Sequence, residues 1–98
     1  MAESTSNVRT LGELRDYVHQ NLCRHENLVA EQFKLQEIPL LRKGQPCGLQ
    51  FVLHGPRQVR LGAVWAADQN HVFYYDARGE RFRKEVLTHR IDASEIAA

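Results

Sequence analysis

The chain has 98 residues, of which 43% are hydrophobic and 26% charged, so its composition is that of one small folded domain and excludes a disordered protein. Its 13 basic and 12 acidic side chains leave a net charge of +1, which gives no global electrostatic attraction to nucleic acid or to a membrane. The longest apolar run, "LGAVWAA", is far shorter than the roughly 20 residues that cross a bilayer, so we expect no membrane span.

The two ends of the chain differ in composition from its middle. Residues 1–9 are polar and contain no apolar segment of a secretory signal, so we expect a flexible leader and a cytoplasmic protein. We expect residues 10–90 to form a single domain without repeats and residues 91–98 to form a loose tail. The two cysteines, Cys23 and Cys47, have no spacing typical of a disulfide framework or a metal site and are expected to be free thiols.

Residues 11–25 carry the pattern of an amphipathic helix. Thr10 followed by Glu13 is a capping-box pattern, in which the hydroxyl and the carboxylate each accept a hydrogen bond from a free backbone N–H at the helix start. Apolar residues and one histidine then recur at steps of three and four: Leu11, Leu14, Val18, Leu22 and His25. This spacing predicts a helix over 11–25 with one stripe facing the core.

The segment that follows this helix is compatible with two different short helices. Asn27 is a suitable cap for a helical turn through "LVAEQF". Alternatively, a helix begins near Gln36, has Pro39 in its first turn and ends at Gly44. We therefore expect one or two helices before the strands begin near Pro46.

Residues 47–60, "CGLQFVLHGPRQVR", predict a β-hairpin. If residues 55–57 form a three-residue connection, all the apolar side chains share one face, because side chains alternate along a strand. The paired residues are then Leu53 with Val59, Phe51 with Leu61, Leu49 with Ala63, and Cys47 with Trp65. In one extended strand Cys47 and His54 are about 23 Å apart and on opposite faces, so they cannot form a catalytic dyad.

The last third of the chain predicts two more strands. "VFYYD" is rich in β-forming residues, and "DARG" is typical of a type I turn closed by a glycine in the left-handed region. The expected register sets Val72 against Trp65 and Tyr74 against both Ala63 and Phe82. The core face then gains Val72, Tyr74, Phe82 and Val86. The whole pattern predicts an α+β fold, with one or two N-terminal helices packed on a four-stranded antiparallel meander.

The opposite face of this sheet is the candidate binding face. Its residues are Arg60, Phe73, Tyr75, Arg81 and Arg83. Aromatic rings among arginines can stack bases and neutralise phosphates, as in proteins that bind single-stranded nucleic acids. A helix or a second subunit that covers this face would account for the aromatic residues equally well. The exposure of Phe73 and Tyr75 is therefore the observation that separates these hypotheses.

Other chemistry has little support in the sequence. His19 and Cys23 lie four residues apart on the predicted helix, but a structural zinc site normally takes four ligands, so we expect no metal. The sequence contains no catalytic motif and no dinucleotide fingerprint. We therefore expect no catalytic residue and no cofactor.

Three stretches, "PCGLQF", "GPRQVRLGAVW" and "FYYDARGERF", carry a resemblance. Together they resemble a family of short bacterial proteins to which no activity is assigned, over about residues 10–88. The resemblance implies a bacterial, intracellular origin and no site residue.

These observations lead to two hypotheses of different classes. The first is a non-enzymatic interaction module that binds another protein or a second copy of itself, because aromatic residues are expected on both sheet faces without a catalytic constellation. The alternative is a single-stranded nucleic-acid-binding protein that uses the candidate binding face. An enzyme of unidentified reaction comes third.

Overall fold

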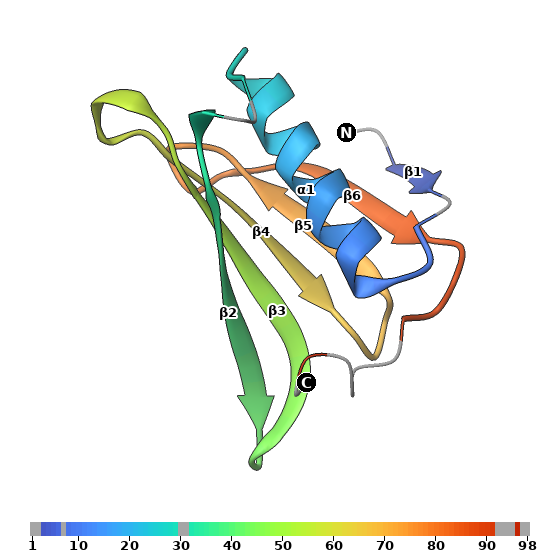
Figure 1. Cartoon of the computed structure of the whole chain (residues 1–98). Helices are drawn as coiled ribbons and strands as arrows, with labels where there is room; N and C mark the ends of the chain where they lie inside the picture. Colours follow the sequence, from blue (N-terminus) through green and yellow to red (C-terminus); the bar gives the residue numbers. More distant parts are fainter. Residues whose placement is uncertain (1–2, 7, 30–31, 92–95, 97–98) are drawn as a thin grey trace.

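A computed structural model of the chain describes residues 3–6, 8–29, 32–91 and 96. Helix α1 (Leu11–His25) lies across one face of a curved sheet (Figure 1). The strands are β1 (Glu3–Ser6), β2 (Leu35–Arg42), β3 (Gln45–His54), β4 (Arg60–Ala66), β5 (His71–Tyr75) and β6 (Arg81–Leu87), in the spatial order β1-β6-β5-β4-β3-β2. We call the face under α1 the inner face and the opposite one the outer face. The predicted α+β class with an antiparallel sheet is confirmed.

The predicted first helix is confirmed at both ends. The Glu13 N–H donates to the Thr10 hydroxyl oxygen at 3.1 Å, and the Thr10 N–H donates to the Glu13 carboxylate at 3.2 Å. Leu14, Val18 and Leu22 are fully buried against the inner face. Local capping and apolar spacing thus determine where α1 begins and which side it buries.

The sheet contains one antiparallel strand more than the four that were predicted. A helix from Gln36 to Gly44 is wrong, because this segment forms β2 at the edge of the sheet; the alternative helical turn includes residues 30–31, which lie outside the described residues. Pro39 is tolerated because an edge strand needs hydrogen bonds on one side only. Lys43 and Gly44, with φ of 52° and 79°, make a two-residue turn of the kind that joins adjacent antiparallel strands.

The hairpin of β3 and β4 has the predicted faces but not the predicted register. Leu53 pairs with Leu61 and Leu49 pairs with Trp65, two residues away from the expected partners. The connection is longer than expected because Pro56–Gln58 form a turn of 3-10 helix, closed by the Gly55 N–H donating to the Val59 carbonyl at 2.7 Å. A shift of the register by two residues keeps every side chain on its face, so the core residues predicted for β3 and β4 remain correct.

The turn from β5 to β6 is the predicted one. The Asp76 N–H donates to the Glu80 carbonyl, the Gly79 N–H donates to the Asp76 carbonyl, both at 2.9 Å, and Gly79 has φ of 81°. The pairs of Val72 with Trp65 and of Tyr74 with Ala63 are also confirmed.

A β-bulge changes the faces of β6. Tyr75 pairs with Arg81 but Tyr74 pairs with Arg83, so one extra residue lies between these two pairs. As in other bulges, two consecutive residues, Phe82 and Arg83, then turn to the same side. Phe82 packs on the inner core as predicted, although it does not pair with Tyr74.

The residues beyond this bulge are shifted relative to the prediction. Val86 was expected on the core face, and this is wrong: it pairs with His71, whose neighbours in β5 place it on the outer face. Glu85 and Leu87 are buried on the inner face instead. An acidic side chain therefore takes a place in the core for which an apolar one was predicted.

Both ends of the chain contribute to the domain. Residues 3–6, which were expected in the leader, form β1 in parallel pairing with β6, and Val8 is buried. From the expected tail, Ile91 is buried and Ile96 packs against the core, whereas residues 92–95 and 97–98 lie outside the described residues. Within the described ranges, no helix has the length and apolarity that crossing a bilayer requires.

Candidate outer-face site and cleft

The outer face brings together four of the five predicted site residues. The strand register places Tyr75 and Arg81 in one cross-strand row with Val52, and Phe73 in the next row with Val64. Arg60 opens β4 on the same side. The only described helix longer than one turn, α1, lies on the inner face, so among the described residues no long helix covers this surface.

Arg81 organises the aromatic residues of the outer face. Its guanidinium carbon lies 4.3 Å from the Phe73 ring centre and 5.7 Å from the Tyr75 ring centre. It also donates to the Tyr75 hydroxyl at 3.3 Å. Phe73 and Tyr75 are consequently only partly exposed, although no helix within the described ranges covers them. A guanidinium over a ring is attractive by about 0.5–1 kcal/mol at such sites, so the three side chains form one preassembled cluster.

Arg83 does not belong to this site, and its predicted place on the outer face is wrong. The bulge turns it to the inner side, where its guanidinium carbon lies 5.7 Å from the Tyr74 ring centre. Lys84 takes its place: it pairs with Phe73 and so lies in the outer row. If side chains are assigned to faces by simple alternation and the bulge is ignored, Arg83 is placed on the outer face and Lys84 on the inner one.

The outer face separates basic from acidic side chains. Its positions on the strands β2 to β6 carry the cations Arg60, Arg81 and Lys84 and no Asp or Glu, since the carboxylates of β2 and β6 lie on the inner face; at the sheet edge, Glu3 of β1 pairs with Lys84. Of these, Glu37 is held in an ion pair with Arg15 of α1. At the edge of the face, the Asp76 carboxylate accepts hydrogen bonds from the N–H groups of Glu80 and Arg78 at 2.9 Å, which lower its pKa.

A hollow of about 330 Å³ opens in the middle of the outer face. It exists because Gly62 stands between Val52 and Tyr75 in the cross-strand row and has no side chain to fill the gap. Ile38, which is 38% exposed, lies at its β2 side, and Arg60 lies at its rim. The hollow thus has an apolar base, with Arg60 on its rim and Asp76, whose carboxylate is bound by backbone N–H groups of its own turn, at its β5–β6 end.

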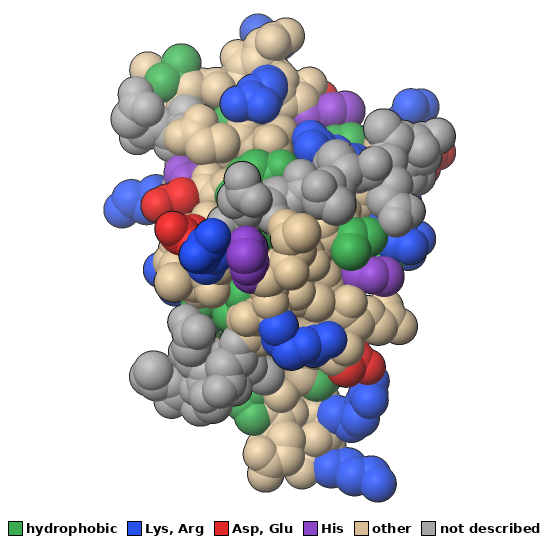
Figure 2. Space-filling view, turned by 90° about the vertical axis from the view of Figure 1, so that its right-hand side faces the viewer, with side chains coloured by type: hydrophobic (Ala, Val, Ile, Leu, Met, Phe, Trp, Pro, Cys, Tyr) green, Lys and Arg blue, Asp and Glu red, His purple; other side chains and the backbone are tan. Residues whose placement is uncertain are grey.

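The side of the molecule shown in Figure 2 looks different. There, Lys and Arg side chains are spread over the surface, and the hydrophobic side chains of described residues show only in small separate areas (Figure 2). An apolar surface framed by cations is therefore not a general property of this protein's exterior.

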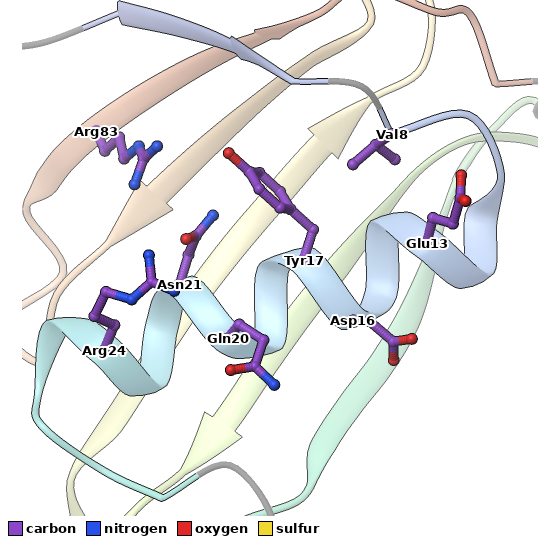
Figure 3. A pocket seen from close by; sticks show the side chains of 8 residues that line it. All are labelled: Val8, Glu13, Asp16, Tyr17, Gln20, Asn21, Arg24 and Arg83. Carbon is purple, nitrogen blue, oxygen red and sulfur yellow. The ribbon is translucent and has the colours of Figure 1, made fainter.

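A second concave region, which we call the α1–β6 cleft, was not predicted from the sequence. It has a volume of about 540 Å³ (Figure 3). Its lining residues are Val8, Glu13, Asp16, Tyr17, Gln20, Asn21, Arg24 and Arg83. Tyr17, Asn21 and Arg24 follow one another at steps of four and three, which places them along one side of the helix. This polar stripe runs beside the apolar stripe that buries α1, and it was the sequence signal from which the cleft could have been predicted.

Buried polar side chains lie beneath the α1–β6 cleft. The side chain of Glu85 is fully buried, and its Oε1 lies 3.1 Å from Arg83 Nη2. No described residue gives either Glu85 oxygen a well-aligned hydrogen bond. Burial, and next the nearby Glu85 carboxylate, raise the pKa of Tyr17.

A tyrosine and an asparagine continue this cluster into the core. Asn21 Nδ2 donates to the Tyr74 hydroxyl at 3.1 Å, and burial of Tyr74 raises the pKa of its hydroxyl. We call Tyr17, Asn21, Tyr74, Arg83 and Glu85 the polar cluster.

The cysteines and histidines do not assemble into a site. Cys23 and Cys47 are free thiols, and burial raises the pKa of Cys23. His19 Nε2 lies 2.6 Å from the Phe33 carbonyl, and His54 lies beside Gln36, at the opposite end of β3 from Cys47. In the part of the chain that the structure describes, no group of three or more His, Cys, Asp or Glu side chains could hold a metal ion.

Comparison with protein-family models, curated proteins and solved structures finds no match to this chain. The resemblance to short bacterial proteins stays a prediction. The outer face and the α1–β6 cleft are therefore the features of this protein that bear on its function.

Proposed function

We propose that this protein is a non-enzymatic binding module whose outer sheet face takes up an extended, acidic segment of a partner protein. The observation that carries the proposal is the charge pattern of this face, where Arg60, Arg81 and Lys84 lie beside apolar side chains and the strands β2 to β6 contribute no carboxylate. Complementary charge directs association and suppresses wrong partners. The chemistry of the face therefore selects a negatively charged partner.

The hollow at Gly62 suggests how side chains of such a segment would be recognised. An extended chain turns alternate side chains to the same side. An apolar side chain of the partner would enter the hollow between Val52 and Tyr75, and an acidic one would meet Arg60 at its rim. The partner that fits best is therefore a segment with an apolar and an acidic residue two positions apart, so that both side chains point toward the outer face.

A second copy of this chain fits the outer face less well. Two such faces brought together would oppose Arg60, Arg81 and Lys84 to the same cations of the other copy. Like charges in close opposition are destabilising in sheets and at interfaces.

Single-stranded nucleic acid is the second candidate, favoured by the cluster of Arg81, Phe73 and Tyr75. Base stacking requires a ring face that a base can cover. In this protein Arg81 lies over the Phe73 ring and donates to the Tyr75 hydroxyl, so a base would have to displace it. For this reason the acidic protein segment is the better-supported partner.

The test is a titration of the protein with a synthetic peptide of the repeat Val-Ser-Glu-Ser, which presents Val and Glu on the same side of an extended chain, followed by backbone amide chemical shifts. We expect shifts in β3, β4 and β5 around the hollow. Each of Arg60→Gln, Arg81→Gln and Lys84→Gln should weaken binding by about 2- to 5-fold, the value of one exposed ion pair. Arg9→Gln, an exposed cation next to the start of α1, is the matched control and should leave the affinity unchanged.

The same titration with an oligothymidylate decides between the two candidates. If the oligonucleotide binds more tightly than the peptide, with affinity falling by about 0.7 logarithmic units per phosphate contact for each tenfold rise in salt, the protein binds nucleic acid. Absence of shifts with both probes would overturn the outer face as a binding surface.

A further inference from the structure

The α1–β6 cleft lies on the other side of the sheet from the proposed binding face, so its role is independent of the proposed function. Figure 3 shows Tyr17, Asn21 and Arg24 of α1 and Arg83 of β6 directed toward the space between these two elements; Asp16 and Gln20 also line the cleft, from the other side of the helix in this view. Side chains from two elements far apart in the sequence thus converge on one concave surface.

The groups at the Arg24 and Arg83 end of the cleft are mainly hydrogen-bond donors, whereas the other end carries the carboxylates of Glu13 and Asp16. A guanidinium has five N–H donors and no acceptor, and a tyrosine hydroxyl and an asparagine amide can each donate. The carboxylate of Glu13, at the other end of the cleft, is already used: its Oε1 accepts hydrogen bonds from the N–H groups of Arg9 at 2.9 Å and Thr10 at 3.2 Å. The end of the cleft near Arg24 and Arg83 therefore favours a negatively charged group.

The buried Glu85 explains why Arg83 is held at this position. A carboxylate that is fully removed from water is strongly destabilising unless a cation lies beside it. Arg83 Nη2, 3.1 Å from Glu85 Oε1, supplies that cation, and the Arg83 side chain is 32% exposed on the cleft side. Because the guanidinium is a planar fork of several donors, it can bind Glu85 with one edge and an oxyanion with another.

The other parts of the cleft indicate the rest of the ligand. Val8 and the ring of Tyr17 give it an apolar wall (Figure 3). Its volume of about 540 Å³ lies within the range of about 300–1,000 Å³ in which proteins bind small molecules. The cleft therefore has room for an apolar body attached to the anionic group.

We propose that the α1–β6 cleft binds a small molecule that carries a carboxylate or phosphate group on an apolar body, with Arg24 and Arg83 as the cations that hold the oxyanion. Asn21, which has a second amide N–H beside the one that it donates to the Tyr74 hydroxyl, donates to the same group, and the Tyr17 ring packs on the apolar body. Glu85 is a positioning residue, which acts by holding Arg83.

The experiment is a titration with benzoate and with phenyl phosphate, followed by backbone amide shifts. Benzyl alcohol, which has the ring without the charge, and benzamidine, which has the opposite charge, are the ligand controls. We expect both anions to shift amides of α1 between Tyr17 and Arg24 and of β6 around Arg83, and to leave the amides around Gly62 in place. The anion that binds more tightly identifies which of the two oxyanion groups the cleft prefers.

Matched variants then test the residues. Arg24→Gln should weaken binding of the anions about 10-fold or more, as expected for the loss of a charge-assisted hydrogen bond, while Arg57→Gln in the turn before β4 should leave it unchanged. Because Arg83→Gln alone leaves Glu85 without its cation, the second variant is the double change Arg83→Gln with Glu85→Gln, which removes both charges of the pair. This variant should stay folded by circular dichroism and lose affinity at least as strongly as Arg24→Gln.

Three results would overturn the proposal: benzamidine or benzyl alcohol binding as tightly as benzoate, no amide shifts with either anion, or full affinity in the Arg24→Gln protein. All three are independent of the peptide titration on the outer face.

Discussion

The two faces of this sheet show different uses of the same alternating pattern. On the inner face, Phe51, Trp65 and Tyr74 are fully buried beneath α1. On the outer face, Phe73 and Tyr75 stay partly exposed and are joined to Arg81. Strands alternate with a period of two, so one sequence supplies a packed core and, on the next residues, a charged aromatic surface. Stability is therefore expected to reside on one face and binding on the other.

The separation fails in β6, where the bulge carries Arg83 to the inner side and Glu85 lies in the core. β6 is thus the exception to the separation of an apolar inner face from a charged outer face. The inner face contains one polar cluster beside a cleft, whereas its other buried polar side chain in the sheet region, Asn70, is fully used by the fold. Asn70 accepts a hydrogen bond from the Trp65 indole at 3.2 Å and donates to the His89 carbonyl at 2.9 Å.

The largest effect should come from Phe51→Ala, which removes a fully buried ring from the inner face. We expect the free energy of unfolding to fall by about 3–5 kcal/mol, since the substitution loses apolar burial and leaves a cavity. Chemical denaturation monitored by Trp65 fluorescence measures it. An unchanged midpoint would contradict the assignment of the inner face as the core.

Next in size is Arg83→Ala, which leaves the Glu85 carboxylate buried without its cation. Loss of one partner of a buried pair costs about 3–5 kcal/mol, and the partial exposure of Arg83 places this variant near the lower end. Adding Glu85→Gln should restore much of the lost stability. If the double variant unfolds as readily as Arg83→Ala alone, the pair does not stabilise the fold as described.

Asn70→Ala tests the buried polar group that the fold does use. It leaves the Trp65 indole N–H and the His89 carbonyl without this partner, so the free energy of unfolding should fall by about 1–3 kcal/mol. The indole N–H resonance of Trp65 should shift in the folded variant. Its constancy would show that Asn70 does not accept that hydrogen bond in solution.

Tyr75→Ala tests whether the outer face contributes to stability. The ring is partly exposed and packs mainly against Arg81, so we expect a loss of stability below about 1 kcal/mol. Binding of the acidic peptide should weaken in the same variant. A loss as large as that of Phe51→Ala would mean that the outer face is a second core, covered in solution.

The smallest effect concerns pH and Asp76, at the edge of the outer face. The hydrogen bonds that its carboxylate accepts from the Glu80 and Arg78 N–H groups stabilise the charged form and lower its pKa in the folded state. Its contribution to stability is therefore present above the pKa of the unfolded chain and is lost as the pH falls through the folded pKa. Stability of Asp76→Asn should fall less steeply with acid than that of the native chain, and identical acid curves would contradict this role.

How far the sequence predicts this fold depends on how local the signals are. The capping box at Thr10 and the apolar stripe after it act within a few residues, and α1 is confirmed. The faces of β3 and β4 follow from alternation alone, whereas their register depends on the 3-10 turn at Pro56–Gln58, which a simple count of loop residues misses. The strand β2 was hidden by Pro39, which suits either the start of a helix or an edge strand; the usable signal was the Lys43-Gly44 turn after it.

The candidate sites show the same limit. Arg60, Phe73, Tyr75 and Arg81 were grouped correctly because they precede or face the bulge without crossing it, while Arg83 and Lys84 follow it and were exchanged. A bulge inserts one residue without a strong sequence signal, and every later side chain changes face. The polar cluster was missed for this reason, since Glu85 enters the core only once the bulge is counted.

The parallel pairing of β1 with β6 has a consequence for the order of folding. The strands β2 to β6 are each paired with their neighbour in the sequence, so their contacts close short loops and can form early. The contacts of β1 join Glu3 to Lys84 and Ser6 to Leu87, and the entropy of closing so long a loop is recovered only when β6 is already in place. We therefore expect β1 to dock last, and its backbone amides to exchange with solvent sooner than those of β3 and β4.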